Sequence, residues 1–163
     1  AIPHITSTHL VLLCGCYDIP AHYEWEQRRG VEHLSTMTPA MGGHANFNDL
    51  SPLWVLESLS ADCPALLSQF CSLGLPQKID MVHGMADVTV PISTSLRLYR
   101  TFSRIIHAAD FPRPQLRFVT HPERGHAEFV MAFMLHAHPS ADSVEHLLMF
   151  LVRGVEEGKE RRK

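Results

Sequence analysis

Three segments with strand-like patterns of apolar residues divide this chain and predict its β-strands. Residues 9–16 form a continuous apolar run, which is typical of a strand that is covered on both faces. Residues 77–83 and 116–120 are bounded by turn-forming residues and predict two more strands. The three expected strands are far apart along the chain, so the segments between them decide the fold class.

Helix signals fill those intervals. Residues 92–109 carry apolar side chains at helical spacing, and residues 21–37 are compatible with a helix that Gly30 interrupts. Further helices are expected over 128–135 and from about residue 140. Strands that alternate with helices favour a layered fold with a mostly parallel sheet. The predicted fold class is therefore α/β, with parallel strands and flanking helices.

The segment 38–52 breaks this alternation. It is rich in Pro, Gly and Asn, which predicts a long loop. A loop of that length in a compact domain is usually functional. At its end, Ser51 and Pro52 suit the cap and the first position of another helix.

Composition narrows the function mainly by exclusion. The chain has 163 residues, of which 45% are hydrophobic and 19% charged, as expected for one globular domain rather than a disordered segment. No apolar run approaches the roughly 18 residues of a membrane span. A net charge of −3 gives no electrostatic footprint for a nucleic acid, so no such partner is predicted.

Cysteine and histidine spacings predict no metal site. Cys14-Gly15-Cys16 lacks the two intervening residues of a CxxC motif, and buried free thiols are expected there. The histidine sets that suggest themselves match no common zinc pattern: His121 with His126, and His136 with His138 and His146.

Two loops carry the residues with the clearest chemistry. Residues 83–91 follow the second expected strand, and residues 121–127 follow the third. Loops after the carboxyl ends of parallel strands meet at one edge of the sheet, so Asp87 in the first loop can reach His126 in the second. A buried Asp that is hydrogen-bonded to a His ring fixes its tautomer and stabilises the imidazolium formed during catalysis.

These residues resemble a known fold family. His83-Gly84-x-x-Asp87-x-x-Val90-Pro91 followed by Gly125-His126 resembles the acid and base loops of the α/β-hydrolases, whose triad runs Ser, Asp, His along the chain. Upstream motifs are similar to the isoprenylcysteine methylesterases, with kynurenine formamidases as relatives: Gly15-x-Tyr17-Asp18, His22-Tyr23, Arg29-Gly30, Leu34-Ser35-x-Met37 and Ser51-Pro52.

The resemblance implies that the chain is one half of a catalytic domain. No Gly-x-Ser-x-Gly occurs in it, so the nucleophile is expected outside the chain, before Ala1. Residues 1–163 then form a single partial domain, the carboxyl-terminal half of an α/β-hydrolase. Residues 18–52 form a cap or loop insertion in it, and residues 155–163 form a charged tail. Ser35, Ser51 and Ser95 lack the context of a nucleophile.

The implied activity is hydrolysis of a carboxylic ester without a cofactor. Asp87 and His126 are the implied catalytic residues, and Tyr23, Trp25 and Met37 the implied lining of the substrate pocket. The substrate would be a small or lipidated ester, such as a prenylcysteine methyl ester, and the chain would act inside the cell, at an internal membrane if it follows the methylesterases. To complete the active site, the chain would need the amino-terminal half of the fold or a partner chain.

The alternative is a protein of another class. A hydrolase fold without its nucleophile can serve as a non-catalytic structural or interaction subunit. The first expected strand would leave an open sheet edge, where a partner can pair. The part of the protein that carries the missing half of the fold distinguishes the ester hydrolase from the non-catalytic subunit.

Overall fold

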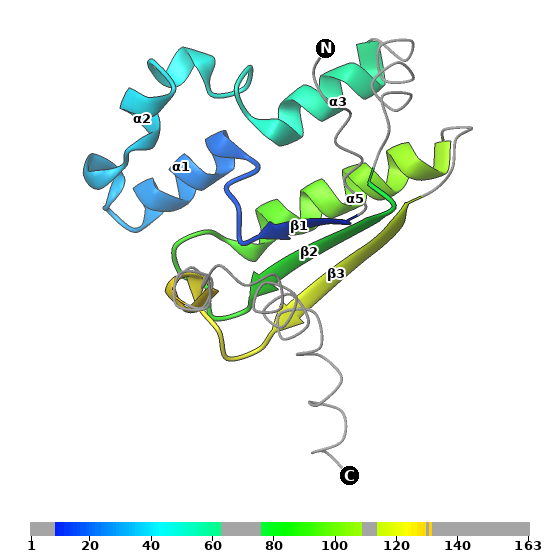
Figure 1. Ribbon diagram of the computed structural model, residues 1–163. Coiled ribbons are helices and arrows are strands. Elements are labelled where there is room, and N and C mark those ends of the chain that lie inside the picture. Colours follow the sequence, from blue (N-terminus) through cyan, green and yellow to red (C-terminus); the bar gives the residue numbers. More distant parts are fainter. Residues whose placement is uncertain (1–8, 63–75, 109–113, 130, 132–163) are drawn as a thin grey trace, which may run out of the picture.

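A computed structural model describes residues 9–62, 76–108, 114–129 and 131 (Figure 1). Its centre is a three-stranded parallel sheet in the order β1-β2-β3, which is also the order along the chain. The strands are β1 (His9–Leu13), β2 (Lys78–Gly84) and β3 (Gln115–His121). The predicted α/β class, with parallel strands and flanking helices, is confirmed.

Helices fill the connections between the strands. The described ones are α1 (Ile19–Arg28), α2 (Met37–Ala40), α3 (Pro52–Asp62) and α5 (Ile92–Ala108), with 3-10 turns at Glu32–Leu34 and His44–Asn46. Pro52 opens α3 as the sequence predicted, because its fixed φ suits the first turn of a helix. Asp18 caps α1, since its Oδ1 accepts a hydrogen bond from the amide of Ala21 at 3.3 Å.

One predicted element ends earlier than the sequence indicated, and another ends where the sequence predicted a break. Strand β1 stops at Leu13 instead of residue 16, because Cys14 adopts a φ of +41° and turns the chain. In the segment 21–37, the helix ends at Arg28, and Gly30 (φ +69°), the residue expected to interrupt it, supplies the left-handed conformation that ends it. The segment 38–52 was expected to be one long loop, and it contains short helical turns.

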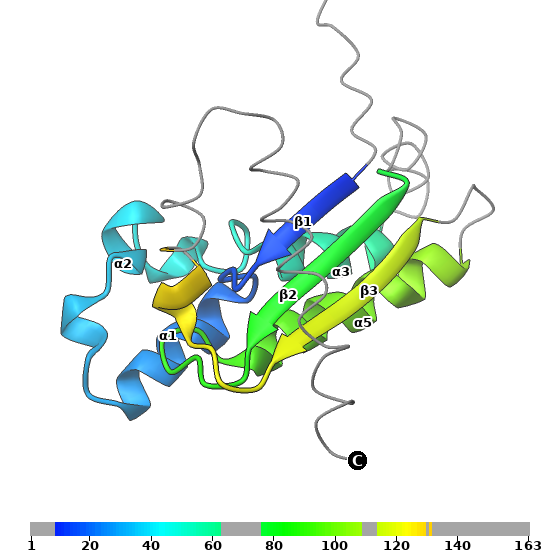
Figure 2. The ribbon, with the colours of Figure 1, turned by 60° about the horizontal axis from the view of Figure 1, so that its bottom comes forward.

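The sheet is covered differently on its two faces. Helices α3 and α5 pack on one face, where Leu53 and Leu98 contact Ile79 and Met81 of β2 (Figure 2). The opposite face forms a smaller apolar cluster of Cys14, Val82, Val119 and Phe129. Because both faces of β2 are buried, its adjacent residues Met81 and Val82 are both apolar and pack into the two different clusters.

A buried carboxylate joins all three strands. Asp80 of β2 is fully buried and accepts two hydrogen bonds from the Arg117 guanidinium of β3, at 2.6 and 2.9 Å. His9 of β1 donates to it at 2.7 Å, and Lys78 lies 3.4 Å away. Desolvation raises the pKa of Asp80, but the bonds from Arg117 and His9 outweigh it and hold the pKa below its usual value.

Several sequence predictions fall outside the described residues. These are most of the helix expected over 128–135, the helix from residue 140, the charged tail 155–163, and the histidines at 136, 138 and 146. Within the described ranges, no helix is both long and apolar enough to cross a membrane.

Candidate functional site

The loops after β2 and β3 dock against each other at the carboxyl edge of the sheet. The amide of Met85 donates to the carbonyl of His121 at 2.9 Å, and the amide of Ala86 donates to that of Arg124 at 3.1 Å. Gly84 permits this approach, since a Cβ there would lie 2.0 Å from the Arg124 carbonyl oxygen. The contact fixes the two loops relative to each other.

Asp87 is held rigidly within the first loop. Its Oδ1 accepts hydrogen bonds from the amides of Thr89 at 2.8 Å and Val90 at 2.9 Å, an arrangement that aspartate favours in turns. The carboxylate itself is completely buried. These bonds leave Oδ2 for a partner from another part of the chain.

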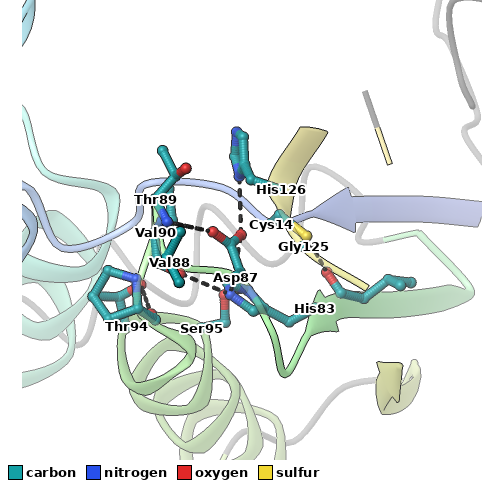
Figure 3. Close-up of polar contacts among 12 residues, drawn as sticks. Cys14, His83, Asp87, Val88, Thr89, Val90, Thr94, Ser95, Gly125 and His126 are labelled. Atoms are coloured by element: carbon teal, nitrogen blue, oxygen red, sulfur yellow. Dashed lines mark hydrogen bonds and ion pairs between the residues drawn. The ribbon is translucent and has the colours of Figure 1, made fainter. Parts of the chain in front are cut away.

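That partner is His126. Its Nδ1 lies 3.0 Å from Asp87 Oδ2, and 31% of its side chain remains exposed (Figure 3). A carboxylate only accepts hydrogen bonds, so Nδ1 carries the proton and Nε2 is left able to accept one. His126 begins the helical segment 126–129, and Gly125 before it donates its amide to the Glu128 carboxylate. The structure therefore brings together the acid and base residues predicted from the sequence.

A second histidine lies behind the carboxylate. His83 is fully buried at the end of β2, with Nε2 3.6 Å from Asp87 Oδ2. Nε2 donates to the carbonyl of Val90 at 3.0 Å, so Nδ1 is unprotonated and accepts from the Ser95 hydroxyl at 2.8 Å. Burial lowers the pKa of His83, although the Val90 bond and the Asp87 charge oppose it. The ring is thus a neutral support for the Asp87 loop.

The Cys14 thiol lies within 4.8 Å of the Asp87 carboxylate, and the positive φ of Cys14 is also typical of a strained catalytic turn. The chemistry of its thiol argues against a catalytic role. Burial raises the pKa of the thiol to about 11, and Sγ donates to the carbonyl of Val82 at 3.7 Å. A reactive cysteine needs a lowered pKa and access, and Cys14 is 2% exposed. We therefore assign Cys14 to the core.

Cys14, His83 and Asp87 also offer a three-donor cluster within 4.8 Å. A metal ion would need lone pairs that are already used. Both ring nitrogens of His83 are hydrogen-bonded, and Asp87 accepts from backbone amides and from His126. Hydrogen bonding rather than coordination accounts for this cluster.

The residues expected to line a substrate pocket are dispersed. Tyr23 packs its ring against His44 and Phe47, with centroids 4.6 and 5.4 Å away. Trp25 instead donates its indole N–H to the carbonyl of Val88 at 3.0 Å, next to Asp87. Met37 begins the short helix α2 and is half-buried. Their binding role remains a prediction, with Trp25 the one that contacts the acid loop.

The three serines that lacked a nucleophile's context have structural bonds. Ser35 accepts from the amide of Met37 at 3.2 Å. Ser51 accepts from the amide of Ile19 at 3.2 Å and donates to the carbonyl of Tyr17 at 2.9 Å, so it ties the loop after β1 to the start of α3. Ser95 donates to His83.

Two features of the site escaped the sequence analysis. One is the support of Asp87 by His83 and Ser95, and the other is the contact from α1 through Trp25 and Arg29, which both donate to Val88. The only available signal was the position of His83 at the end of a strand. No known protein family, curated protein or solved structure matches this chain.

Proposed function

We propose that this chain is the acid-and-base half of a serine hydrolase that cleaves carboxylic esters. The observation that carries the proposal is the 3.0 Å contact between His126 Nδ1 and Asp87 Oδ2. It joins a buried carboxylate to a partly exposed imidazole at the carboxyl edge of a parallel sheet, where α/β proteins carry their sites.

In the proposed reaction, His126 Nε2 removes the proton from an attacking serine hydroxyl. The serine oxygen bonds to the ester carbonyl carbon, and His126 then gives that proton to the departing alcohol. Water hydrolyses the acyl-enzyme in a second, equivalent step. Asp87 keeps the proton on Nδ1 and stabilises the imidazolium that forms, and it is not itself protonated.

The nucleophile and the oxyanion hole have to come from residues other than those of this chain. The described β1 is hydrogen-bonded to β2 along one side, and its other side is an edge within the described sheet. Further strands from the rest of a hydrolase fold can pair there. Alone, the chain should hydrolyse esters negligibly, because its sequence has no Gly-x-Ser-x-Gly and the proposal places the nucleophile and the oxyanion hole in the other half of the fold.

The substrate class rests on the motif resemblance. A prenylcysteine methyl ester is the first candidate, and a formamide is the close alternative. Trp25, through its contact with the Asp87 loop, and Tyr23 and Met37 on neighbouring elements are the proposed binding residues. An action at an internal membrane belongs to this same proposal.

A non-catalytic interaction subunit is the second candidate. The same open edge of β1 favours it, because a partner can complete a sheet without any chemistry. The intact Asp87–His126 pair favours the enzyme, since a scaffold needs neither a buried carboxylate nor an oriented imidazole.

The test is fluorophosphonate labelling of the native protein, captured from its source with an antibody against this chain. The enzyme proposal expects a stoichiometric adduct on a serine outside residues 1–163, in the same polypeptide or in a tightly bound partner. Absence of labelling in folded material contradicts the proposal and favours the interaction subunit. An adduct on Ser35, Ser51 or Ser95 contradicts the half-domain account.

Variants of the site test whether labelling depends on His126 and Asp87. His126→Gln and Asp87→Asn should each slow labelling by roughly 10⁴-fold, the scale seen when a triad loses its base or its orienting carboxylate. His107→Gln is the matched control, because this exposed histidine on α5 bonds only within its own helix among the described residues.

A further inference from the structure

A separate cavity lies between helices α3 and α5. Its volume is about 290 Å³, and its lining consists of Glu57, Arg97, Arg100, Thr101 and Arg104. Along α5, Arg100 and Arg104 are about 12–18 Å from the first residue of the helix, Ile92, which follows the acid loop. The cavity is therefore distinct from the Asp87–His126 pair.

One wall of the cavity consists of side chains that are already paired with one another. The Arg97 guanidinium donates to the buried Asp18 carboxylate and lies 3.7 Å from Glu57. It also sits 6.0 Å from the ring centre of Trp54. Thr101 donates its hydroxyl to Glu57 at 3.2 Å, so Glu57 is occupied by two partners. The carboxylate of the cavity is thus committed to its own wall.

The other arginines are not balanced in this way. Arg100 and Arg104 are exposed, and neither makes a hydrogen bond or an ion pair with any part of the chain that the structure describes. They stand four residues apart on one face of α5, where like charges repel and destabilise a helix. Counted with Asp18, which pairs with Arg97, the site holds three guanidinium groups against two carboxylates, and its excess charge lies on Arg100 and Arg104. This excess positive charge is concentrated in a concave site.

We propose that this cavity binds a phosphate group, with Arg100 and Arg104 as its principal ligands. Guanidinium groups present fixed, paired N–H donors that match the oxygens of phosphate, which makes arginine the preferred residue for such recognition. The volume is at the lower limit of small-molecule pockets, so it accommodates the phosphate and only a few further atoms. The group would belong to a soluble phosphorylated metabolite or to a lipid headgroup.

The test is calorimetric titration of the full chain with inorganic phosphate at constant ionic strength. Saturable binding is expected, and R100Q/R104Q should weaken it at least about tenfold. R28Q is the matched control, because Arg28 is exposed on α1 and pairs with Glu24 away from the cavity. Equal binding by wild type and R100Q/R104Q overturns the proposal. It is also overturned if neither inorganic phosphate nor the phosphatidic acid vesicles described next show saturable binding.

A second probe separates the two sources of phosphate. Co-sedimentation with phosphatidylcholine vesicles that contain phosphatidic acid, compared with phosphatidylcholine alone, reports a lipid headgroup. Binding to both vesicles and inorganic phosphate, or to either one, supports the site when R100Q/R104Q removes it. R100K/R104K keeps the charge without the paired donors and should bind with intermediate affinity. Unchanged thermal unfolding of these variants shows that a loss of binding is local.

Discussion

The Nε2 atom of His83 lies 3.6 Å from Oδ2 of Asp87, the same oxygen that accepts from His126. His83 is buried and neutral, and its own bonds to Val90 and Ser95 span the loop that carries Asp87. The acid of the proposed site is therefore supported from the core side by a second histidine. This support has consequences that can be measured in the isolated chain.

His83 should make the chain less stable at mildly acidic pH. Its pKa in the folded chain is lowered by burial, so below about pH 6.5 the unfolded chain binds a proton that the folded chain does not. The free energy of unfolding should therefore fall as pH drops from about 6.5, towards the lower folded pKa.

Urea unfolding of wild type and His83→Gln, compared between pH 7.5 and 5.5, measures this contribution. The variant should lose less stability than wild type over that interval, since glutamine does not titrate. An identical loss in the two proteins would show that His83 does not carry the effect.

Gly84→Ala should separate the two site loops. The new Cβ would lie 2.0 Å from the Arg124 carbonyl oxygen, a backbone atom that cannot move without displacing the loop. We expect a loss of about 2–3 kcal/mol in the free energy of unfolding, the scale of an overpacked core. Gly125→Ala is the control: its closest contact is the flexible Glu128 carboxylate at 3.2 Å, so its loss should be smaller. Equal losses would contradict the docking of the loops.

Cys14 should be unreactive in the folded chain. With a pKa of about 11, its thiol ionises far less at pH 8 than an ordinary cysteine. Alkylation by iodoacetamide, followed at this residue by peptide mass mapping, should be at least about a hundredfold slower than in urea-unfolded protein. Rapid alkylation of the folded chain would instead identify Cys14 as an activated nucleophile beside His126.

The Asp80 network should be one of the main polar contributions to stability. Arg117→Met removes two hydrogen bonds to a buried carboxylate and should cost about 3 kcal/mol, with His9 and Lys78 still in place. Arg28→Ala breaks an exposed pair and should cost no more than about 0.5 kcal/mol.

The same network sets a pH limit. The folded pKa of Asp80 is below its unfolded value, so its stabilisation is present above about pH 4 and is lost as pH falls through the folded pKa. Unfolding curves of both variants at pH 7 and 3.5 check this. A pH-independent difference between wild type and Arg117→Met would contradict the assignment.

The sequence predicted the parts of the fold that depend on hydrophobic pattern. Both faces of β2 are buried, and its apolar residues therefore marked it clearly. The end of β1 was missed because an apolar run does not reveal that Cys14 adopts a positive φ. The turns within 38–52 were missed because Pro and Gly, which suggested a loop, also occur at the ends of short helices.

The contacts of the site were likewise predictable only in part. Asp87 and His126 were predictable because parallel strands bring their following loops to one edge. The bond from Ser95 to His83 depends on how α5 packs on the sheet, which periodicity cannot specify. The pairing of Arg97 with Asp18 joins residues 79 positions apart and left no local signal.

The proposal that Asp87 orients His126 as the general base is tested most directly by ¹⁵N NMR of the full chain at pH 9, which reports the tautomer of His126. We expect a proton on Nδ1 of His126 and an unprotonated Nε2 that can accept one, because Nδ1 donates to Asp87. Asp87→Asn should remove this preference, while Asp49→Asn, an exposed control, should not. A proton on Nε2 in the wild-type chain would contradict the proposed base.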